Sequence, residues 1–213
     1  VRTAAGATAE YNGQEQTADV SQLVFEPALS DTSHIHSAGS GTNVGSYNFN
    51  IYSDQQGYDL VDSGTHTFTI TPKVLTATLT GTNSFSKVYD GTTAMAALTQ
   101  STDYQFIGMV DGDVLGLTGT GNYADKNVGE SKSIVFTGLS LTGADAGNYN
   151  FTTTSLTGNM GKITPKELTV ALTGTNKVSK VYDGATTVTT ALTQGADYQF
   201  IGMVDGDVLG LTG

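Results

Sequence analysis

Short runs of alternating apolar and polar residues extend along almost the whole chain. Before the motif Ile-Thr-Pro-Lys at 70–73, Phe68 and Ile70 alternate with threonines, and after it Leu75 and Ala77 do the same. A period of two residues is typical of strands that bury one face. Amphipathic runs with the 3.6-residue period of a helix are nearly absent, so the pattern predicts an all-β chain.

Seven such runs fall between residues 74 and 166. Turn signals separate them, among them Asp-Gly, Asn-Val-Gly and Gly-Ala-Asp-Ala-Gly. The runs read "VLTATLTG", "SKVYD", "DYQFIGMV", "VLGLTG", "KSIVFTGLSL", "NYNFTTTS" and "TGNMGKIT". Seven short strands in about 93 residues favour a small immunoglobulin-like β-sandwich. The alternative is another small β-sandwich or a β-grasp-like fold.

Part of the sequence occurs twice. "YQFIGMVDGDVLGLTG" stands at Tyr104–Gly119 and again at Tyr198–Gly213, whereas "SKVYDG" recurs with an offset that is one residue shorter. An extra residue inside a strand pair would turn every following side chain to the opposite face, so we place the insertion in a loop or bulge. The period is far longer than the roughly 20–50 residues of solenoid units, and it matches one independent β domain.

The Ile-Thr-Pro-Lys motif marks the predicted domain boundaries. Pro72 and Pro165 fix φ and remove a ladder donor, which stiffens a short connection. We therefore predict tandem domains in an elongated rod: a diverged β domain at 1–73, a complete repeat at 74–166 and part of a second repeat at 167–213. In the alternative, the folding unit is permuted and ends at residues 119 and 213. The partial repeat at 167–213 would leave sheet edges unpaired. We therefore expect another chain to complete it, unless the permuted unit is correct.

Composition excludes several classes of function. The net charge of −11 and the pI near 4.3 argue against nucleic acid or an anionic membrane surface as a partner. The absence of cysteine excludes disulfides, thiolate metal sites and a cysteine nucleophile. No run approaches the roughly 20 apolar residues of a membrane span. The N-terminus has no signal-peptide pattern, and we expect the chain to be a piece of a longer protein.

Aspartates in the turn "VDGDVLG" are the candidate metal ligands. Asp111 and Asp113 flank a glycine, and calcium sites use aspartates at this spacing on turns. Asp103 or Asp125 would complete the set. The copies of the pair are Asp205 and Asp207. Because the full EF-hand spacing is absent, we favour a polar turn without metal, with calcium as the alternative, and no cofactor is otherwise expected.

Histidines offer a second candidate metal site. His34 and His36 share one face of a predicted strand, and His66 follows in the same segment. Two imidazoles could hold Zn²⁺, but no cysteine supports the set, so we expect surface histidines in a loop instead. The repeats contain no histidine, which excludes a Ser/His/acid triad there, and small sandwiches rarely form the deep cleft of a glycosidase. We therefore predict that the chain is not an enzyme.

Tyrosines and a phenylalanine recur in the predicted strands and turns. Tyr-Asp-Gly at 89–91 and 182–184 is typical of a hairpin turn in which glycine takes positive φ and the tyrosine ring packs inward. Ligand recognition by Tyr and Asp is the alternative. The same choice between core packing and an exposed binding cluster applies to Tyr104, Phe106, Tyr123 and Tyr149.

Several spaced motifs resemble a known family. "KVYDGTT", "GDVLGLTGTGNYADKNVG", "LTGADAGNYNF" and "ITPKELTV" resemble the YDG domain, and "EYNGQ", "NVGSYNF" and "GTHTFTITPK" look like the related MBG domain. The resemblance implies repeats in the stalk of a large Gram-negative exoprotein of the filamentous-haemagglutinin type, secreted to the cell surface for adhesion and biofilm formation. Its partners would be neighbouring repeats of the same polypeptide. The alternatives are a module that binds glycan or matrix, and a calcium-stiffened linker.

Overall fold

The computed structural model describes residues 2–3, 7–25, 28–57, 66–81, 85–173, 179–189 and 191–211. Within these ranges the only helices are two single 3₁₀ turns, η1 (Val20–Gln22) and η2 (Ala146–Asn148). The prediction of an all-β chain is confirmed. In the described part of the chain, no helix has the length and apolar character needed to cross a bilayer.

The chain folds into two compact units. The first comprises Val1–Thr82, Ala97–Thr120 and Phe136–Leu156, and the second comprises Asn83–Ala96, Gly121–Val135 and Thr157–Gly213. The boundaries predicted after residues 73 and 166, and the permuted alternative ending at 119 and 213, stay predictions.

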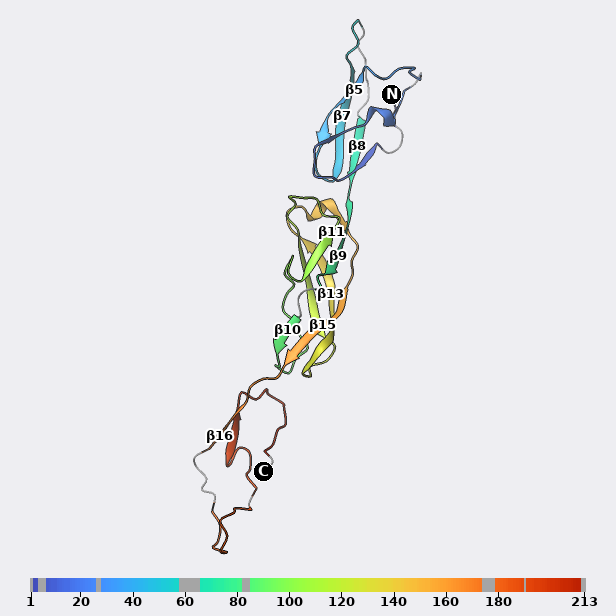
Figure 1. Ribbon diagram of the computed structural model, residues 1–213. Helices are drawn as coiled ribbons and strands as arrows, with labels where there is room; N and C mark the ends of the chain where they lie inside the picture. The colour runs from blue at the N-terminus through green and yellow to red at the C-terminus, as the bar shows by residue number, and fades with distance from the viewer. Residues whose placement is uncertain are drawn as a thin grey trace. The chain divides into compact units, whose positions relative to one another are not determined.

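The N-terminal part of unit 1 contains one four-stranded sheet in the order β2-β8-β7-β5. These strands are β2 (Thr8–Glu10), β5 (Ile35–Ala38), β7 (Gly45–Ser53) and β8 (His66–Thr71). Two short pairs accompany the sheet: β1 (Arg2–Thr3) with β4 (Leu23–Val24), and β3 (Gln16–Thr17) with β6 (Ser40–Gly41). Figure 1 shows β7 between β5 and β8, and β2 pairs with β8 in parallel.

All seven strands predicted between residues 74 and 166 are present. They are β9 (Lys73–Leu79), β10 (Phe85–Val88), β11 (Tyr104–Ile107), β12 (Gly116–Tyr123), β13 (Gly129–Thr142), β14 (Tyr149–Phe151) and β15 (Leu156–Thr164). One sheet has the order β11-β9-β14 and the other has the order β10-β15-β13-β12. Figure 1 shows β11 alongside β9, an antiparallel pair, whereas β14 lies parallel to β9 and β10 lies parallel to β15.

Alternating side chains build the core that the sequence pattern indicates. In β8 and β9 the buried residues are Phe68, Ile70 and Leu75, and in β13 they are Ile134 and Phe136. One cluster of buried residues in unit 1 joins β7, β8 and β9 to Leu115 and Tyr149. The Pro72 junction therefore lies between two strands that contribute to one core.

The second copy forms the same strand pair as the first. β16 (Thr169–Leu172) pairs with β17 (Tyr198–Ile201), and Leu172 lies opposite Tyr198 as Leu79 lies opposite Tyr104. The inserted residue lies in the loop before Tyr198, outside the strands. The repeated blocks thus adopt the same pairing despite the difference of one residue in their spacing.

Candidate functional site

Asp113 lies at the centre of a polar cluster that connects distant parts of unit 1. The hydroxyl group of Tyr11 donates to both carboxylate oxygens of Asp113, at 3.0 Å each. The hydroxyl group of Tyr149 donates to Oδ2 of Asp113 at 2.5 Å and accepts the backbone N–H of Val110 at 2.8 Å. The two tyrosine rings meet edge to face, with centroids 5.5 Å apart. The Asp113 carboxylate therefore holds a tyrosine that lies 102 positions away in the sequence.

Both tyrosines are held in the protonated form that donates a hydrogen bond. Burial raises the pKa of Tyr149 far above its usual value, and the hydrogen bond to Asp113 raises that pKa further. Burial, followed by the hydrogen bond to Asp113, likewise raises the pKa of Tyr11. Hydrogen bonds from neutral donors to an ionised carboxylate are stronger than those between neutral groups. The cluster is therefore suited to holding segments of the chain together.

The glycine of the Tyr-Asn-Gly motif completes this contact. Gly13 has a φ of +76°, and a Cβ atom placed there would lie 2.6 Å from Cγ1 of Val110. Only glycine combines this backbone conformation with so close an approach. The Tyr-x-Gly sequence therefore supplies both a hydroxyl donor and a flat surface for Val110.

A buried asparagine adds specific hydrogen bonds beside the cluster. Asn148, at the end of η2, is 6% exposed. Its Oδ1 accepts the backbone N–H of Val44 at 2.9 Å, and its Nδ2 donates to Oδ1 of Asn43 at 3.1 Å. Because an unsatisfied buried amide would be costly, these two bonds fix the "NVG" turn against the segment that precedes β14.

The second copy repeats the contact within unit 2. The hydroxyl group of Tyr89 donates to Oδ1 of Asp207 at 2.9 Å, and this hydrogen bond is the main cause that raises the pKa of Tyr89. Gly91 has a φ of +79°, and a Cβ atom there would lie 2.7 Å from Cγ1 of Val204. The side chain of Tyr182, in the next Tyr-Asp-Gly, is 92% exposed. We call the paired contacts Tyr11–Asp113 and Tyr89–Asp207 the Tyr–Asp joints.

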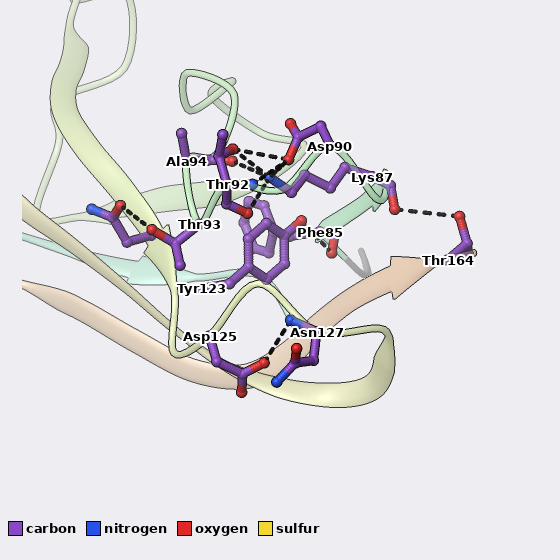
Figure 2. A network of polar contacts seen from close by, with 11 residues as sticks. Phe85, Lys87, Asp90, Thr92, Thr93, Ala94, Tyr123, Asp125, Asn127 and Thr164 are labelled. Atoms are coloured by element: carbon purple, nitrogen blue, oxygen red, sulfur yellow. Dashed lines mark hydrogen bonds and ion pairs between the residues drawn. The ribbon is translucent and has the colours of Figure 1, made fainter. Parts of the chain in front are cut away.

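The aspartate of Tyr-Asp-Gly has a different role, which Figure 2 shows. Nζ of Lys87 donates to Oδ1 of Asp90 at 2.7 Å, to the carbonyl oxygen of Thr92 at 2.8 Å and to that of Ala94 at 3.1 Å. The hydrogen bond from Lys87, followed by that from the Thr92 N–H, lowers the pKa of Asp90 to about 2. Lys180 and Asp183 repeat the ion pair at 2.6 Å. Lysine and aspartate thus order the loop after each motif. The predicted hairpin is wrong for the first motif, because β10 pairs in parallel with β15.

The candidate calcium ligands are either exposed or accept hydrogen bonds from protein groups. Asp111 and Asp205 are exposed, whereas Asp113 and Asp207 accept from tyrosine hydroxyls. The carboxylate of Asp103 accepts the N–H of Thr99, and that of Asp125 accepts from Lys132. Across the described ranges, no three His, Asp or Glu side chains gather in a group that could hold a metal ion.

The three histidines considered as zinc ligands lie in two different environments. Nδ1 of His34 lies 2.8 Å from Oδ1 of Asp54, and Nε2 of His36 lies 2.9 Å from Oδ2 of the same carboxylate. His66 is buried, and its ring packs against Phe49 with centroids 5.4 Å apart. The first two histidines therefore contact one exposed carboxylate at the surface, and the third belongs to the core.

The hypothesis of an exposed aromatic cluster is wrong. Tyr104, Tyr123 and Tyr149 are buried, and Phe106 is half-buried. The hydroxyl oxygen of Tyr104 accepts the N–H of Leu117 at 2.9 Å, and the hydroxyl group of Tyr123 donates to the carbonyl oxygen of Phe85 at 3.0 Å. Core packing, the other interpretation, is correct because strand alternation directs these rings inward.

Sequence reasoning missed the Tyr–Asp joints. It singled out both the Tyr-x-Gly motif and Asp113, but it assigned them to separate roles. The signal in the sequence was that both motifs are duplicated, although their offsets differ: Tyr11 and Tyr89 are 78 positions apart, whereas Asp113 and Asp207 are 94 apart. Only the folded chain shows which of them meet.

Comparison with known proteins gives one positive result. Residues 71–156 match the YDG domain family. No curated protein and no solved structure matches the chain. The match covers β9 to β14 and includes Asp113 of the first joint and Tyr149, which also donates to Asp113. The chain therefore contains a YDG domain at residues 71–156.

Proposed function

We propose that this chain is a non-catalytic stalk segment of a bacterial surface adhesin. In this proposal, immunoglobulin-like β-sandwich repeats in tandem hold a distal binding region away from the cell, and the parent protein is secreted and of the filamentous-haemagglutinin type. The observation that carries the proposal is the repetition of one joint, in which Tyr11 meets Asp113 and Tyr89 meets Asp207. A contact that recurs with the repeat serves the connection between repeats.

The proline connections support a mechanical role. β8 ends at Thr71 and β9 begins at Lys73, so only Pro72 separates the two strands. Pro165 likewise comes directly after Thr164, the last residue of β15. Proline restricts the backbone at each connection, and the Tyr–Asp joint adds a second tie. Two ties at each connection resist bending better than a single flexible linker.

The surface chemistry agrees with a spacer better than with the two alternative functions. Of the aromatic residues that would form a glycan-binding cluster, the three tyrosines are buried and Phe106 is half-buried. The Asp113 carboxylate considered for calcium already accepts two hydroxyl groups. A net charge of −11 keeps many neighbouring copies soluble and apart. No observation favours the glycan, matrix or calcium alternatives over the spacer.

Surface display tests the proposal directly. One, two or three copies of the whole chain are placed between a cell-surface anchor and an epitope tag, and gold labelling with electron microscopy measures the height of the tag. A stiff spacer adds the same height with every copy. Matched Gly/Ser linkers of equal length are the control, because the reach of a random coil grows only as about the square root of its length.

Two outcomes would reject the proposal. Height that follows the square-root dependence of the Gly/Ser control would show that the repeats do not stiffen the chain. Saturable binding of a glycan or matrix preparation by the isolated chain, removed by substitutions on its surface, would assign it to the class of ligand-binding modules instead.

A further inference from the structure

The second repeat contains an open groove at the position where the first repeat is filled. A hollow of about 200 Å³ lies in unit 2 beside Tyr89, Pro165, Leu168, Val204 and Asp207. Their counterparts in unit 1 carry the same residue types: Tyr11, Pro72, Leu75, Val110 and Asp113. In unit 1 the ring and hydroxyl group of Tyr149 occupy this place, against Tyr11, Val110 and Asp113.

The starting residues of β9 and β16 also differ between the two repeats. In the first repeat, β14 pairs in parallel with Lys73, Val74 and Leu75, the first three residues of β9. The corresponding residues of the second repeat, 166–168, precede β16 and lie outside any strand. β16 begins only where pairing with β17 begins. The part of the strand that lacks regular structure is therefore the part that β14 would stabilise.

Exposure of the apolar side chains agrees with this comparison. Leu75 is 0% exposed and its counterpart Leu168 is 40% exposed, while Leu115 is 7% exposed and its counterpart Leu209 is 39% exposed. The lining of the groove also includes Val128, the counterpart of Val44 in the "NVG" turn. In unit 1 the N–H of Val44 donates to Asn148. Each element that receives Asn148 and Tyr149 in the first repeat is thus present and uncovered in the second.

We propose that this groove binds an extended peptide strand of the Asn-Tyr-Asn-Phe type, supplied by a YDG sequence. The strand adds in parallel to residues 166–168, its tyrosine hydroxyl group donates to Asp207, and its asparagine bonds the turn at Asn127 and Val128. Addition of a strand to an exposed edge is a general mode of peptide recognition, in which backbone bonds give affinity and pockets give specificity. The inference rests on the proposed function, because it treats the repeats as equivalent modules.

A labelled peptide tests the proposal on the whole chain. The peptide has the sequence of residues 143–155, GADAGNYNFTTTS, and fluorescence anisotropy measures its binding. We expect saturable binding, together with new protection from hydrogen exchange of the amide of Leu168, because its counterpart Leu75 is bonded to the segment of β14. A peptide with Tyr149→Phe lacks the hydroxyl donor and is expected to bind about tenfold more weakly, as expected for the loss of a hydrogen bond to a charged acceptor.

Matched variants of the chain locate the binding site. Leu168→Asp places a charge in the groove and is expected to abolish binding, whereas Leu172→Asp, at a side chain that is 75% exposed in β16, leaves it intact. Asp207→Asn weakens binding and Asp205→Asn, in the same turn, does not. Equal binding to the Leu168→Asp chain would overturn the proposal, since the peptide would then lie elsewhere.

Two further results separate this inference from its alternatives. Self-association of the chain that Leu168→Asp abolishes, with no binding of the peptide, would assign the groove to a second copy and overturn the proposal. Absence of peptide binding, with tag height still proportional to copy number, would reject the groove while leaving the stalk function intact. Peptide binding without proportional height would reject the stalk function alone.

Discussion

Tyr11 and Asp113 meet at 3.0 Å although 102 positions separate them in the sequence. Tyr89 and Asp207, 118 positions apart, meet at 2.9 Å. A tyrosine from a Tyr-x-Gly turn and an aspartate from an Asp-Gly-Asp turn therefore form the same pair twice. This repetition gives the tyrosine of the motif a physical role, which is to join the turn to a later segment of the chain.

Removing the Tyr11 hydroxyl group is expected to destabilise unit 1. A hydrogen bond to a charged acceptor contributes about 1.5–3 kcal/mol, and Tyr11 is 3% exposed. We expect Tyr11→Phe to lower the free energy of unfolding by an amount in the lower part of this range, because Asp113 keeps its bond from Tyr149. Urea denaturation measures the change. Tyr52→Phe, at a half-exposed ring, is the control, and an equal effect of both substitutions would show that the joint adds no stability.

Substitution of the motif glycines separates backbone strain from contact. Gly91→Ala introduces a residue at φ +79° and a Cβ atom 2.7 Å from Val204, whereas Gly184→Ala introduces one at φ +76° with no atom within 4 Å. Strain at positive φ costs about 1–2 kcal/mol in each case. The clash adds about 1–3 kcal/mol at Gly91 only. Thermal denaturation of the two variants measures the difference, and equal losses would argue against close packing at the Tyr89 joint.

The strand pattern was predictable because it depends on local chemistry. Alternation of Phe68 and Ile70 with threonines indicates β8, and the turn residues between runs separate the seven later strands. The ends of the strands were less predictable, because they depend on the backbone conformation of single residues. The run "DYQFIGMV" predicts a strand to residue 110, but β11 ends at Ile107 because Gly108 turns the chain at φ +95°.

The sequence pattern did not predict which distant segments pair with one another. The parallel pairs of β14 with β9 and of β10 with β15 depend on topology, which a period of two residues does not specify. For the same reason Asp113 was recognised as a turn residue, with calcium binding as the alternative, but its hydrogen-bond partners were not predicted. Its partners, Tyr11 and Tyr149, come from segments that only the fold brings together.

Lys87→Met is expected to raise the pKa of Asp90 from about 2 toward its usual 3.8. Because the folded-state pKa is the lower one, the ion pair stabilises the fold above the unfolded-state pKa and loses this effect as the pH falls from about 3.8 to about 2. Carbon-detected NMR titration of the carboxyl group measures the shift. Asp183, paired with Lys180, is the internal control and should keep its lowered pKa. An unchanged pKa of Asp90 would show that the Thr92 N–H bond alone is sufficient.

Tyr104 and Tyr198 occupy equivalent positions in the two repeats, and they test how far the core of each repeat is shielded from water. The hydroxyl oxygen of Tyr104 accepts the N–H of Leu117 at 2.9 Å within the core, and Leu117 is 6% exposed. The corresponding bond from Leu211 to Tyr198 is 3.3 Å long, and Leu211 is 47% exposed.

Tyr104→Phe leaves a buried N–H without its acceptor, which costs about 1–3 kcal/mol. Tyr198→Phe leaves an N–H that water can reach, so the expected loss is much smaller. Denaturant titration of both variants gives the two values. If bound GADAGNYNFTTTS peptide covers the second groove, the loss from Tyr198→Phe should grow toward that from Tyr104→Phe, because the same N–H then loses access to water. A loss that stays small with the peptide bound would mean that the added strand does not close the core of the second repeat.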